Sequence, residues 1–199
     1  MKILVTGFEP FGGESINPSR EAVMRADAPA GAEIIRRTLP VTWKGGKEAL
    51  LSLIGETEPD IVLMTGQAGG RKGVTIERIG VNCMEASIPD NDGVKMCGEA
   101  IFPGAPDGLF STFDYRAVKK ALDDGGIDAS FSFSAGAFIC NLVLYTALHT
   151  AQTAKKPFRA GFIHLPYLPE QAHDALPSLT LDEQTRAVSL ALSALAKEA

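Results

Sequence analysis

The chain has 199 residues, a net charge of −5 and a pI near 5.2. With 45% hydrophobic and 22% charged residues, it has the composition of an ordinary globular protein, and its length suits one substantial core, so we expect a single domain over residues 1–199. No basic cluster offsets the negative charge. The composition therefore excludes binding that depends on contacts to nucleic-acid phosphates, and we expect no nucleic-acid partner.

The chain shows no signal for secretion, a membrane or a disulfide framework. Only a few apolar residues follow Met1-Lys2, too few for a signal peptide, and the longest apolar stretch, 138–148, is too short for a membrane span. We therefore expect a cytoplasmic protein with no membrane partner. The three cysteines, Cys83, Cys97 and Cys140, are widely spaced and odd in number, a pattern that favours neither disulfides nor a zinc site.

In the first third of the chain, apolar runs alternate with glycine-rich loops and helix signals. The runs 2–6, 33–39 and 60–65 predict buried strands. Asn17-Pro18 predicts a capped helix after the first strand, and 47–54 the end of a second helix. This repetition is typical of a parallel sheet with helices on both faces, an α/β fold.

The rest of the chain continues the pattern with one long irregular segment. The expected elements are a strand at 74–82, a segment of turns, a hairpin or a mobile loop at 86–109, a helix capped by Ser111-x-x-Asp114 that stops at 123–126, strands at 128–134 and 159–165, and a final helix capped by Thr180-x-x-Glu183.

The most informative stretch is the turn from 134 to 141, which carries Cys140 one step into an apolar helix. A strand that feeds a helix leaves the first helical turn at the carboxyl edge of the sheet, where ligands of open α/β sheets bind. There the helix dipole can lower a cysteine pKa from about 8.5 to roughly 3.5–7.5. The alternative is that Cys140 packs as a small core residue, as many free cysteines do.

Three histidines could serve as a base for Cys140. His149 lies nine residues further along the same helix and points roughly opposite to the cysteine. His173 lies in a polar stretch typical of a solvated surface. His164 closes the strand that follows the helix, so a right-handed crossover would place it beside the cysteine strand at the same edge.

A carboxylate is needed to orient the imidazole, and Glu77, Glu85, Asp90 and Asp92 are candidates. Glu77 stands out because a charge within an apolar strand is costly unless it is paired. A structural ion pair with an arginine, Arg71 or Arg78, is the competing interpretation.

Two glycine-rich loops are candidate ligand sites. Gly7-x-x-x-x-Gly12 lacks the lysine and hydroxyl residue of a phosphate-binding P-loop, and the carboxylate of Glu14 would repel phosphate. Phe8 and Phe11 on that loop suit the wall of a small apolar pocket, or equally fold back onto the core. The loop 66–71 could cradle an anion or simply allow a tight turn.

Together these residues resemble the pyroglutamyl peptidase I family, also called pyrrolidone-carboxylate peptidase, a family of cysteine peptidases. The resemblance runs nearly end to end through six motifs: Thr6-Gly-Phe-x-Pro-Phe-Gly-Gly13, Gly66-Gln-Ala-Gly-Gly-Arg71, Glu77-Arg78 with Asn82, Ile88-Pro-Asp-Asn91, Ala135-Gly-x-Phe-x-Cys-Asn141 and Gly161-Phe-Ile-His-x-Pro166.

The resemblance implies a three-layer α/β/α sandwich with an open, mostly parallel twisted sheet, phosphorylase/hydrolase-like. It implies a thiol protease that hydrolyses the bond after an N-terminal pyroglutamyl residue with Glu77, Cys140 and His164 as catalytic residues. It implies no cofactor and no metal, pyroglutamylated peptides as partners, and a homo-oligomer, tetramer or dimer. By resemblance the substrate pocket contains Phe8, Phe11, Gln67, Ile88, Phe138 and Ile139.

One position departs from the family pattern. Members usually have arginine where this chain has Ser87, within Ala86-Ser-Ile-Pro-Asp-Asn91. If that arginine acts on the oxyanion, its loss could cost on the order of 10²–10³ in rate, unless Arg71 or Arg78 compensates. The alternatives to an active peptidase are a weakened or non-catalytic pyroglutamyl-peptide-binding protein on the same fold, and a phosphate-using transferase, which rests on the glycine loops alone.

Overall fold

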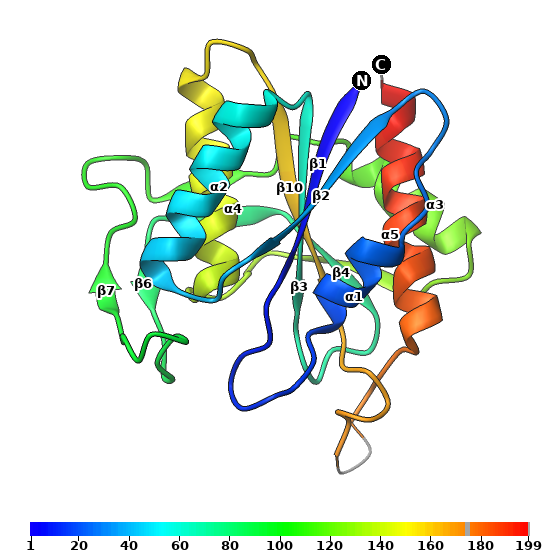
Figure 1. Cartoon of the computed structure of the whole chain (residues 1–199), viewed down its shortest axis with the longest axis horizontal. Helices are drawn as coiled ribbons and strands as arrows, with labels where there is room; N and C mark the ends of the chain where they lie inside the picture. Colours follow the sequence, from blue (N-terminus) through cyan, green and yellow to red (C-terminus); the bar gives the residue numbers. More distant parts are fainter. Residues whose placement is uncertain (174–175, 199) are drawn as a thin grey trace.

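The computed structural model describes residues 1–173 and 176–198 and is built around a six-stranded sheet in the order β2-β1-β3-β10-β4-β9 (Figure 1). The strands β1, β2, β3 and β10 are mutually parallel. The bounds of the six strands are Lys2–Phe8 for β1, Glu33–Leu39 for β2, Ile61–Gln67 for β3, Val74–Glu77 for β4, Ala129–Ser132 for β9 and Arg159–Leu165 for β10.

Helices cover both faces of this sheet, which makes three layers and confirms the predicted α/β/α class (Figure 1). One face carries α1 (Pro18–Arg25), α3 (Tyr115–Asp124) and α5 (Leu181–Leu195). The other carries α2 (Trp43–Thr57) and α4 (Ile139–Thr153). The short 3₁₀ helix η1 (Ala196–Glu198) follows α5. In the described part of the chain, no helix is long and apolar enough to cross a bilayer.

Four of the helices, α1, α2, α3 and α5, start at side-chain caps. Asn17 accepts the backbone N–H of Ser19 ahead of α1, and Thr180 and Glu183 form the predicted capping box of α5. The prediction for α3 was wrong in detail, because Asp114 itself is the N-cap. The hydroxyl of Ser111 instead donates to the backbone oxygen of Glu77 at 2.6 Å, so it joins the loop before α3 to strand β4.

The sheet is not parallel throughout. Strand β4 is antiparallel to β10, and β9 pairs only with β4 within the six-stranded sheet, parallel to it. The loop 68–73 between β3 and β4 is too short for the crossover that a parallel connection needs, about a dozen residues or more. We predicted that a right-handed crossover places the His164 strand directly beside the strand before Cys140. That prediction is wrong, because β4 lies between β9 and β10.

The predicted strand 74–82 is split after Glu77. Its second half, β5 (Ile79–Val81), leaves the main sheet and pairs with β8 (Gly108–Phe110). A second two-stranded sheet joins β6 (Met84–Glu85) to β7 (Cys97–Glu99), so the irregular segment holds hairpin-like pairs as expected. The segment contacts α4 through β5, β6 and β8, and so lies against the helix that carries the cysteine.

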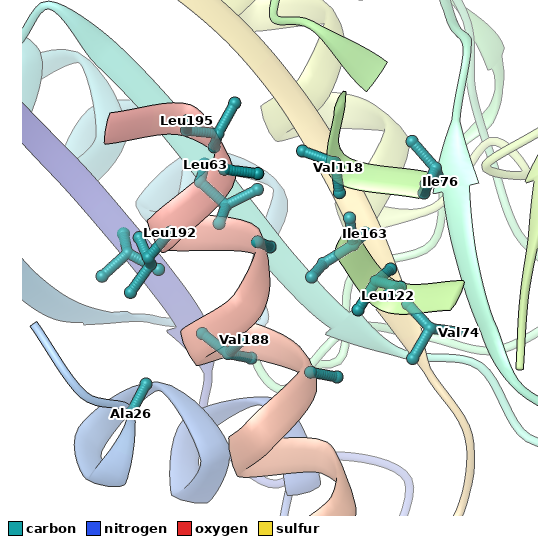
Figure 2. Packing of buried hydrophobic residues seen from close by; sticks show 14 of the residues in the cluster. Ala26, Leu63, Val74, Ile76, Val118, Leu122, Ile163, Val188, Leu192 and Leu195 are labelled. Atoms are coloured by element: carbon teal, nitrogen blue, oxygen red, sulfur yellow. The ribbon is translucent and has the colours of Figure 1, made fainter. Parts of the chain in front are cut away.

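Two hydrophobic cores lie on opposite faces of the sheet. Under α1, α3 and α5, aliphatic side chains of the helices interlock with those of β3, β4 and β10 (Figure 2). Under α2 and α4 the core is rich in aromatic rings, including Trp43, Tyr145 and Phe162. The second core extends to the ends of β1, β3 and β10, where the predicted functional residues lie.

Candidate active site

A buried histidine–carboxylate pair joins two neighbouring strands. His164 lies near the end of β10 and Glu77 ends β4, and the antiparallel register pairs His164 with Thr75 and Phe162 with Glu77. His164 is 3% exposed and Glu77 is fully buried. The Nδ1 atom of His164 lies 2.8 Å from Oε1 of Glu77. A cost that would count against a buried carboxylate is thus offset by a charge-assisted hydrogen bond.

Arg71 holds the same carboxylate oxygen. Its guanidinium donates to Oε1 of Glu77 at 2.5 Å, to the hydroxyl of Thr75, and to the backbone oxygen of Ser134 at 3.3 Å. Arg78, the other arginine considered, stacks on the ring of Tyr115, with 3.3 Å between its central carbon and the ring centroid. The ion pair and the histidine pair therefore coexist at Glu77, and the loop 66–71 has its arginine committed to that pair.

The environment sets the protonation of both partners. Burial disfavours the charged form of Glu77, but the hydrogen bonds from His164 and Arg71 outweigh it, and the pKa of this carboxyl lies below its usual value. Burial also lowers the pKa of His164, against the opposing effect of the Glu77 charge. At neutral pH the pair is a carboxylate facing a neutral imidazole. Because a carboxylate only accepts, Nδ1 carries the proton and Nε2 keeps its lone pair.

Cys140 lies in the first turn of α4 and next to β3, the neighbour of β10 in the sheet. A Cβ added at Gly66 of β3 would lie 2.9 Å from the sulfur of Cys140 and 2.7 Å from the ring of Phe162. Gly66 pairs in register with His164, and paired residues of parallel strands point to the same face of a sheet. The thiol and the imidazole therefore lie on the same face of the sheet, and the missing side chain of Gly66 leaves room for the sulfur and for the Phe162 ring.

Asn141 fixes the start of α4. Its side chain is fully buried, accepts the backbone N–H of Val81 at 2.8 Å, and donates to the backbone oxygens of Val81 at 2.8 Å and Cys83 at 3.0 Å. These three bonds tie the turn that carries Cys140 to β5 and the residues after it. The sequence offered a signal for this role, an amide in the apolar first turn of a helix, but its partners lie about 60 residues away.

The structure corrects the expected ionisation of Cys140. Burial, with the charge of Glu77 as the next cause, raises the pKa of this thiol to about 12, and the opposing charge of Arg71 does not reverse the shift. The sequence-based expectation of a lowered pKa counted only the helix dipole. The resting pair is a neutral thiol beside a neutral imidazole, so the histidine has to take the thiol proton when the sulfur attacks.

A narrow apolar cavity opens next to the thiol. Five of the six predicted pocket residues line it together with Cys140, and Ile88 does not, since it is 43% exposed on the loop after β6. Sequence reasoning missed Asn17 and Val41. The lining residues are Phe8, Phe11, Asn17, Val41, Gln67, Phe138, Ile139 and Cys140.

An aromatic ring system shapes one wall of this cavity. The ring of Phe138 packs against Phe11 at 6.3 Å and edge-on against Trp43 at 5.2 Å between centroids. Asp90 is buried and holds the loop 88–94 to α2, accepting the backbone N–H groups of Trp43 and Val94 at 2.8 Å each. The carboxylate of Asp90 thus anchors the pocket wall and does not meet a histidine.

The remaining candidates lie elsewhere. His149 stacks on Phe102, with centroids 4.2 Å apart, and His173 is exposed. Glu85 and Asp92 are also exposed. Ser87 is exposed on the same loop as Ile88. Within residues 1–173 and 176–198, no group of three histidine, cysteine or carboxylate side chains is arranged to hold a metal ion.

A thiol, an imidazole and a carboxylate gathered on one face of a sheet are the working parts of cysteine-type hydrolases. The model of the pyroglutamyl peptidase family matches residues 1–198. This chain belongs to that family.

Individual relatives agree over nearly the whole chain. It is 51% identical to the pyrrolidone-carboxylate peptidase of Thermococcus onnurineus over 189 residues, 94% of each chain, and 43% identical to that of Pyrococcus furiosus over 206 residues, 100% of this chain and 99% of the relative. The crystal structure of Bacillus amyloliquefaciens pyroglutamyl peptidase I superposes with a TM-score of 0.94 at 38% identity, covering 98% and 97% of the two chains. A variant of the Pyrococcus furiosus pyrrolidone carboxyl peptidase gives 0.95 at 42% identity, covering 100% and 99%.

Proposed function

We propose that this chain, as one peptidase domain, hydrolyses the bond after an N-terminal pyroglutamyl residue, with Cys140 as nucleophile, His164 as acid and base, and Glu77 as the orienting carboxylate. The chain is a cysteine-type hydrolase of the pyroglutamyl peptidase family. The observation that supports the residue assignment is the 2.8 Å contact between Nδ1 of His164 and Oε1 of Glu77, with the Cys140 thiol next to Gly66, the residue of β3 that pairs in register with His164.

The order of the proton transfers follows from the neutral thiol and the neutral imidazole of the resting site. Nε2 of His164 accepts the thiol proton as the Cys140 sulfur forms its bond to the pyroglutamyl carbonyl carbon. The imidazolium is stabilised through Nδ1 by the Glu77 carboxylate. When the tetrahedral intermediate collapses, the carbon–nitrogen bond breaks and Nε2 gives its proton to the leaving amine. Water then cleaves the thioester with His164 again acting as the base.

The oxyanion of that intermediate needs hydrogen-bond donors, and the start of α4 offers them. The N-cap residue Phe138 makes no side-chain cap hydrogen bond, so no N-cap side chain occupies the first backbone N–H groups of the helix, and the N–H of Cys140 points to its own sulfur, where the oxyanion would form. Fixed backbone dipoles of this kind stabilise developing negative charge without reorganising during the reaction.

The cavity suits an uncharged ring. A pyroglutamyl lactam carries no charge, and Phe8, Phe11, Phe138 and Ile139 supply apolar walls while Gln67 supplies a polar group. A free amino terminus would bring a positive charge into this cavity, where no lining residue carries a negative charge to pair with it.

The activity is tested with a pyroglutamyl reporter amide. Purified protein should release the amine, and Cys140→Ala should reduce kcat by about 10³-fold or more because the covalent step is lost. A matched prolyl amide, which lacks the ring carbonyl, should not be cleaved. If wild-type protein binds a pyroglutamyl peptide in calorimetry without releasing product, the assignment fails in favour of a binding protein, an alternative that nothing in the comparisons supports.

The departure at Ser87 is tested in the same assay. Arg71 is the arginine whose charge reaches Cys140, where it favours the thiolate, whereas Arg78 lies on the ring of Tyr115. If Arg71 compensates for Ser87, then Ser87→Arg should change kcat by less than about 3-fold, well under the 10²–10³ expected for adding a missing oxyanion donor. A gain of that larger size would show that the chain works with a weakened site.

Self-association and a cytoplasmic location are the remaining parts of the proposal. Large aromatic side chains at the sheet edge support self-association, since Phe131 on β9 is 39% exposed and Phe133 just after it is 67% exposed. Light scattering after size exclusion should give a dimer or tetramer mass, and a monomer mass at micromolar protein would contradict it. Fractionation of cells that express the native gene tests the location.

A further inference from the structure

A single buried glutamine connects the three strand ends that form the cavity. Gln171, in the loop after β10, is only 4% exposed. Its Nε2 lies 3.3 Å from each of three acceptors: the carboxylate of Glu14 in the loop after β1, the backbone oxygen of Ile16, and Oε1 of Gln67 at the end of β3. None of the proposed proton transfers involves this side chain.

The orientation of the Gln171 amide is determined by groups that have only one hydrogen-bonding role. The backbone N–H of Leu168 can only donate, and it lies 3.2 Å from Oε1 of Gln171. The Glu14 carboxylate and the Ile16 carbonyl can only accept, so they require the amide nitrogen of Gln171 on their side. Both requirements agree, and the Gln171 amide has one satisfactory orientation.

This orientation is passed on to Gln67. Because Gln171 presents its NH₂ group, the atom of Gln67 that meets it has to be the acceptor Oε1. The NH₂ group of Gln67 is then left for the cavity that this residue lines, and in the described part of the chain it makes no hydrogen bond to protein. A reversed Gln67 would place two donors against each other and leave buried groups unsatisfied.

We propose that Gln171 is a positioning residue that holds the Gln67 amide with its donor toward the cavity, so that the site selects a five-membered ring bearing a carbonyl acceptor. The inference rests on the proposed function and deepens it. The lactam carbonyl of a pyroglutamyl residue is such an acceptor, whereas the ring of proline offers none.

The sharpest variant is Gln171→Glu, assayed at a pH where the new carboxyl is ionised, because the carboxylate keeps an acceptor for Leu168, has no donor, and faces the acceptors Glu14 and Ile16. The Gln67 amide then turns its NH₂ group to the new carboxylate and presents Oε1 to the lactam carbonyl, acceptor against acceptor. We expect KM for the pyroglutamyl amide to rise about 10- to 100-fold with kcat changed less than about 3-fold, as for an unsatisfied buried acceptor. The exposed Gln152→Glu, at the end of α4, is the matched control and should leave KM unchanged.

A double-mutant cycle separates orientation from loop stability. Gln67→Leu removes the donor and should raise KM several-fold, and adding Gln171→Glu to it should raise KM no further, because there is no amide left to turn. If the KM of the double variant rises by the product of the two single-variant increases, the proposal is overturned. An unchanged KM in Gln171→Glu alone would also overturn it. If Gln171→Glu does not fold, Gln171→Leu takes its place, with an expected KM rise of about 3- to 10-fold that Gln67→Leu again cancels.

The proposed function is judged separately, by wild-type turnover. If wild type is inactive, the same cycle is read by calorimetry with a pyroglutamyl peptide on the Cys140→Ala background. Kd should then follow the pattern expected for KM. If the two substitutions change Kd independently, or if neither changes it, the proposed role of Gln171 is overturned. This outcome does not depend on whether the catalytic assignment is correct.

Discussion

The two faces of the central sheet bury different kinds of side chain. Under α1, α3 and α5 the described core is aliphatic (Figure 2). Phe113 is the single buried aromatic residue among the described residues of this core. Under α2 and α4 the core contains Phe8, Trp43 and Phe162, and the buried His164 packs on the Phe162 ring at 4.6 Å between centroids. The first face is a close-packed support, while the second combines packing with buried polar chemistry, so stability and activity should respond to different substitutions.

We expect the largest difference between the effect on activity and the effect on stability for a substitution at Glu77. Glu77→Gln keeps an acceptor for Arg71 but removes the charge that stabilises the imidazolium and selects its tautomer. By analogy with orienting carboxylates of other triads, kcat should fall about 10³- to 10⁴-fold. Thermal unfolding of the variant should stay within a few degrees of wild type. A loss below about 10-fold would mean that Glu77 serves only as a partner for Arg71.

The opposite result is expected for Leu192, which is fully buried in the aliphatic core. Leu192→Ala should lower the free energy of unfolding by about 2–5 kcal/mol, since it leaves a cavity in a packed interior. Urea unfolding measures this, and kcat per folded molecule at low temperature should match wild type within about 2-fold. A proportional loss of kcat would show that the aliphatic face controls the geometry of the site.

Arg71 should give a smaller change with a distinctive pH signature. Its positive charge lowers the pKa of His164 by sharing Oε1 of Glu77. In Arg71→Met that pKa should rise, and because the reaction needs a neutral imidazole, the acid limb of kcat/KM should move to higher pH, with a rate loss of about 3- to 30-fold at neutral pH.

Arg78→Met is the matched control for Arg71, since Arg78 lies on the ring of Tyr115 on the other face. It should leave the acid limb in place. A limb that moves to lower pH in Arg71→Met, or equally in both variants, would contradict the assignment of Arg71 to the Glu77 pair.

The smallest effect concerns stability and pH. His164 and Glu77 both have folded-state pKa values below their ordinary ones, so each contributes stability that is present above its unfolded pKa and is lost as the pH falls. For His164 the loss begins near its unfolded pKa of about 6.5. The urea midpoint should fall between pH 7.5 and 5.5, and less so in His164→Gln than in the control His173→Gln. Equal declines in both variants would rule out this contribution.

Sequence patterns predicted what is local in this molecule. The strands 33–39 and 159–165 have the predicted bounds, and the aromatic residues at the end of β1, on the loop after it and at the start of α4 line one cavity with Cys140. These features depend on neighbouring residues, whose alternation, capping and glycine content determine the backbone. The family resemblance, which several motifs carried, named the fold class that the structure confirms.

What was missed depends on contacts across the chain. No local signal shows that β10 enters between β3 and β4, so the argument that placed His164 beside the cysteine strand used the wrong geometry. The roles of Asn141 and Gln171 depend on partners about 60 and more than 100 residues away. The thiol pKa was misjudged because burial is a property of the packed protein, whereas the helix dipole is visible in the sequence.

Gly66 has a consequence for how natural sequences of this family vary. Its missing side chain leaves the space that the Cys140 sulfur and the Phe162 ring occupy, with an added carbon only 2.7–2.9 Å from each. Substitution at 66 is therefore tolerable only together with changes at 140 and 162. We expect the three positions to vary jointly, with glycine retained wherever the cysteine is present and released in descendants that have lost it. The variability of position 66, which performs no chemistry itself, would then indicate whether a family member keeps the catalytic cysteine.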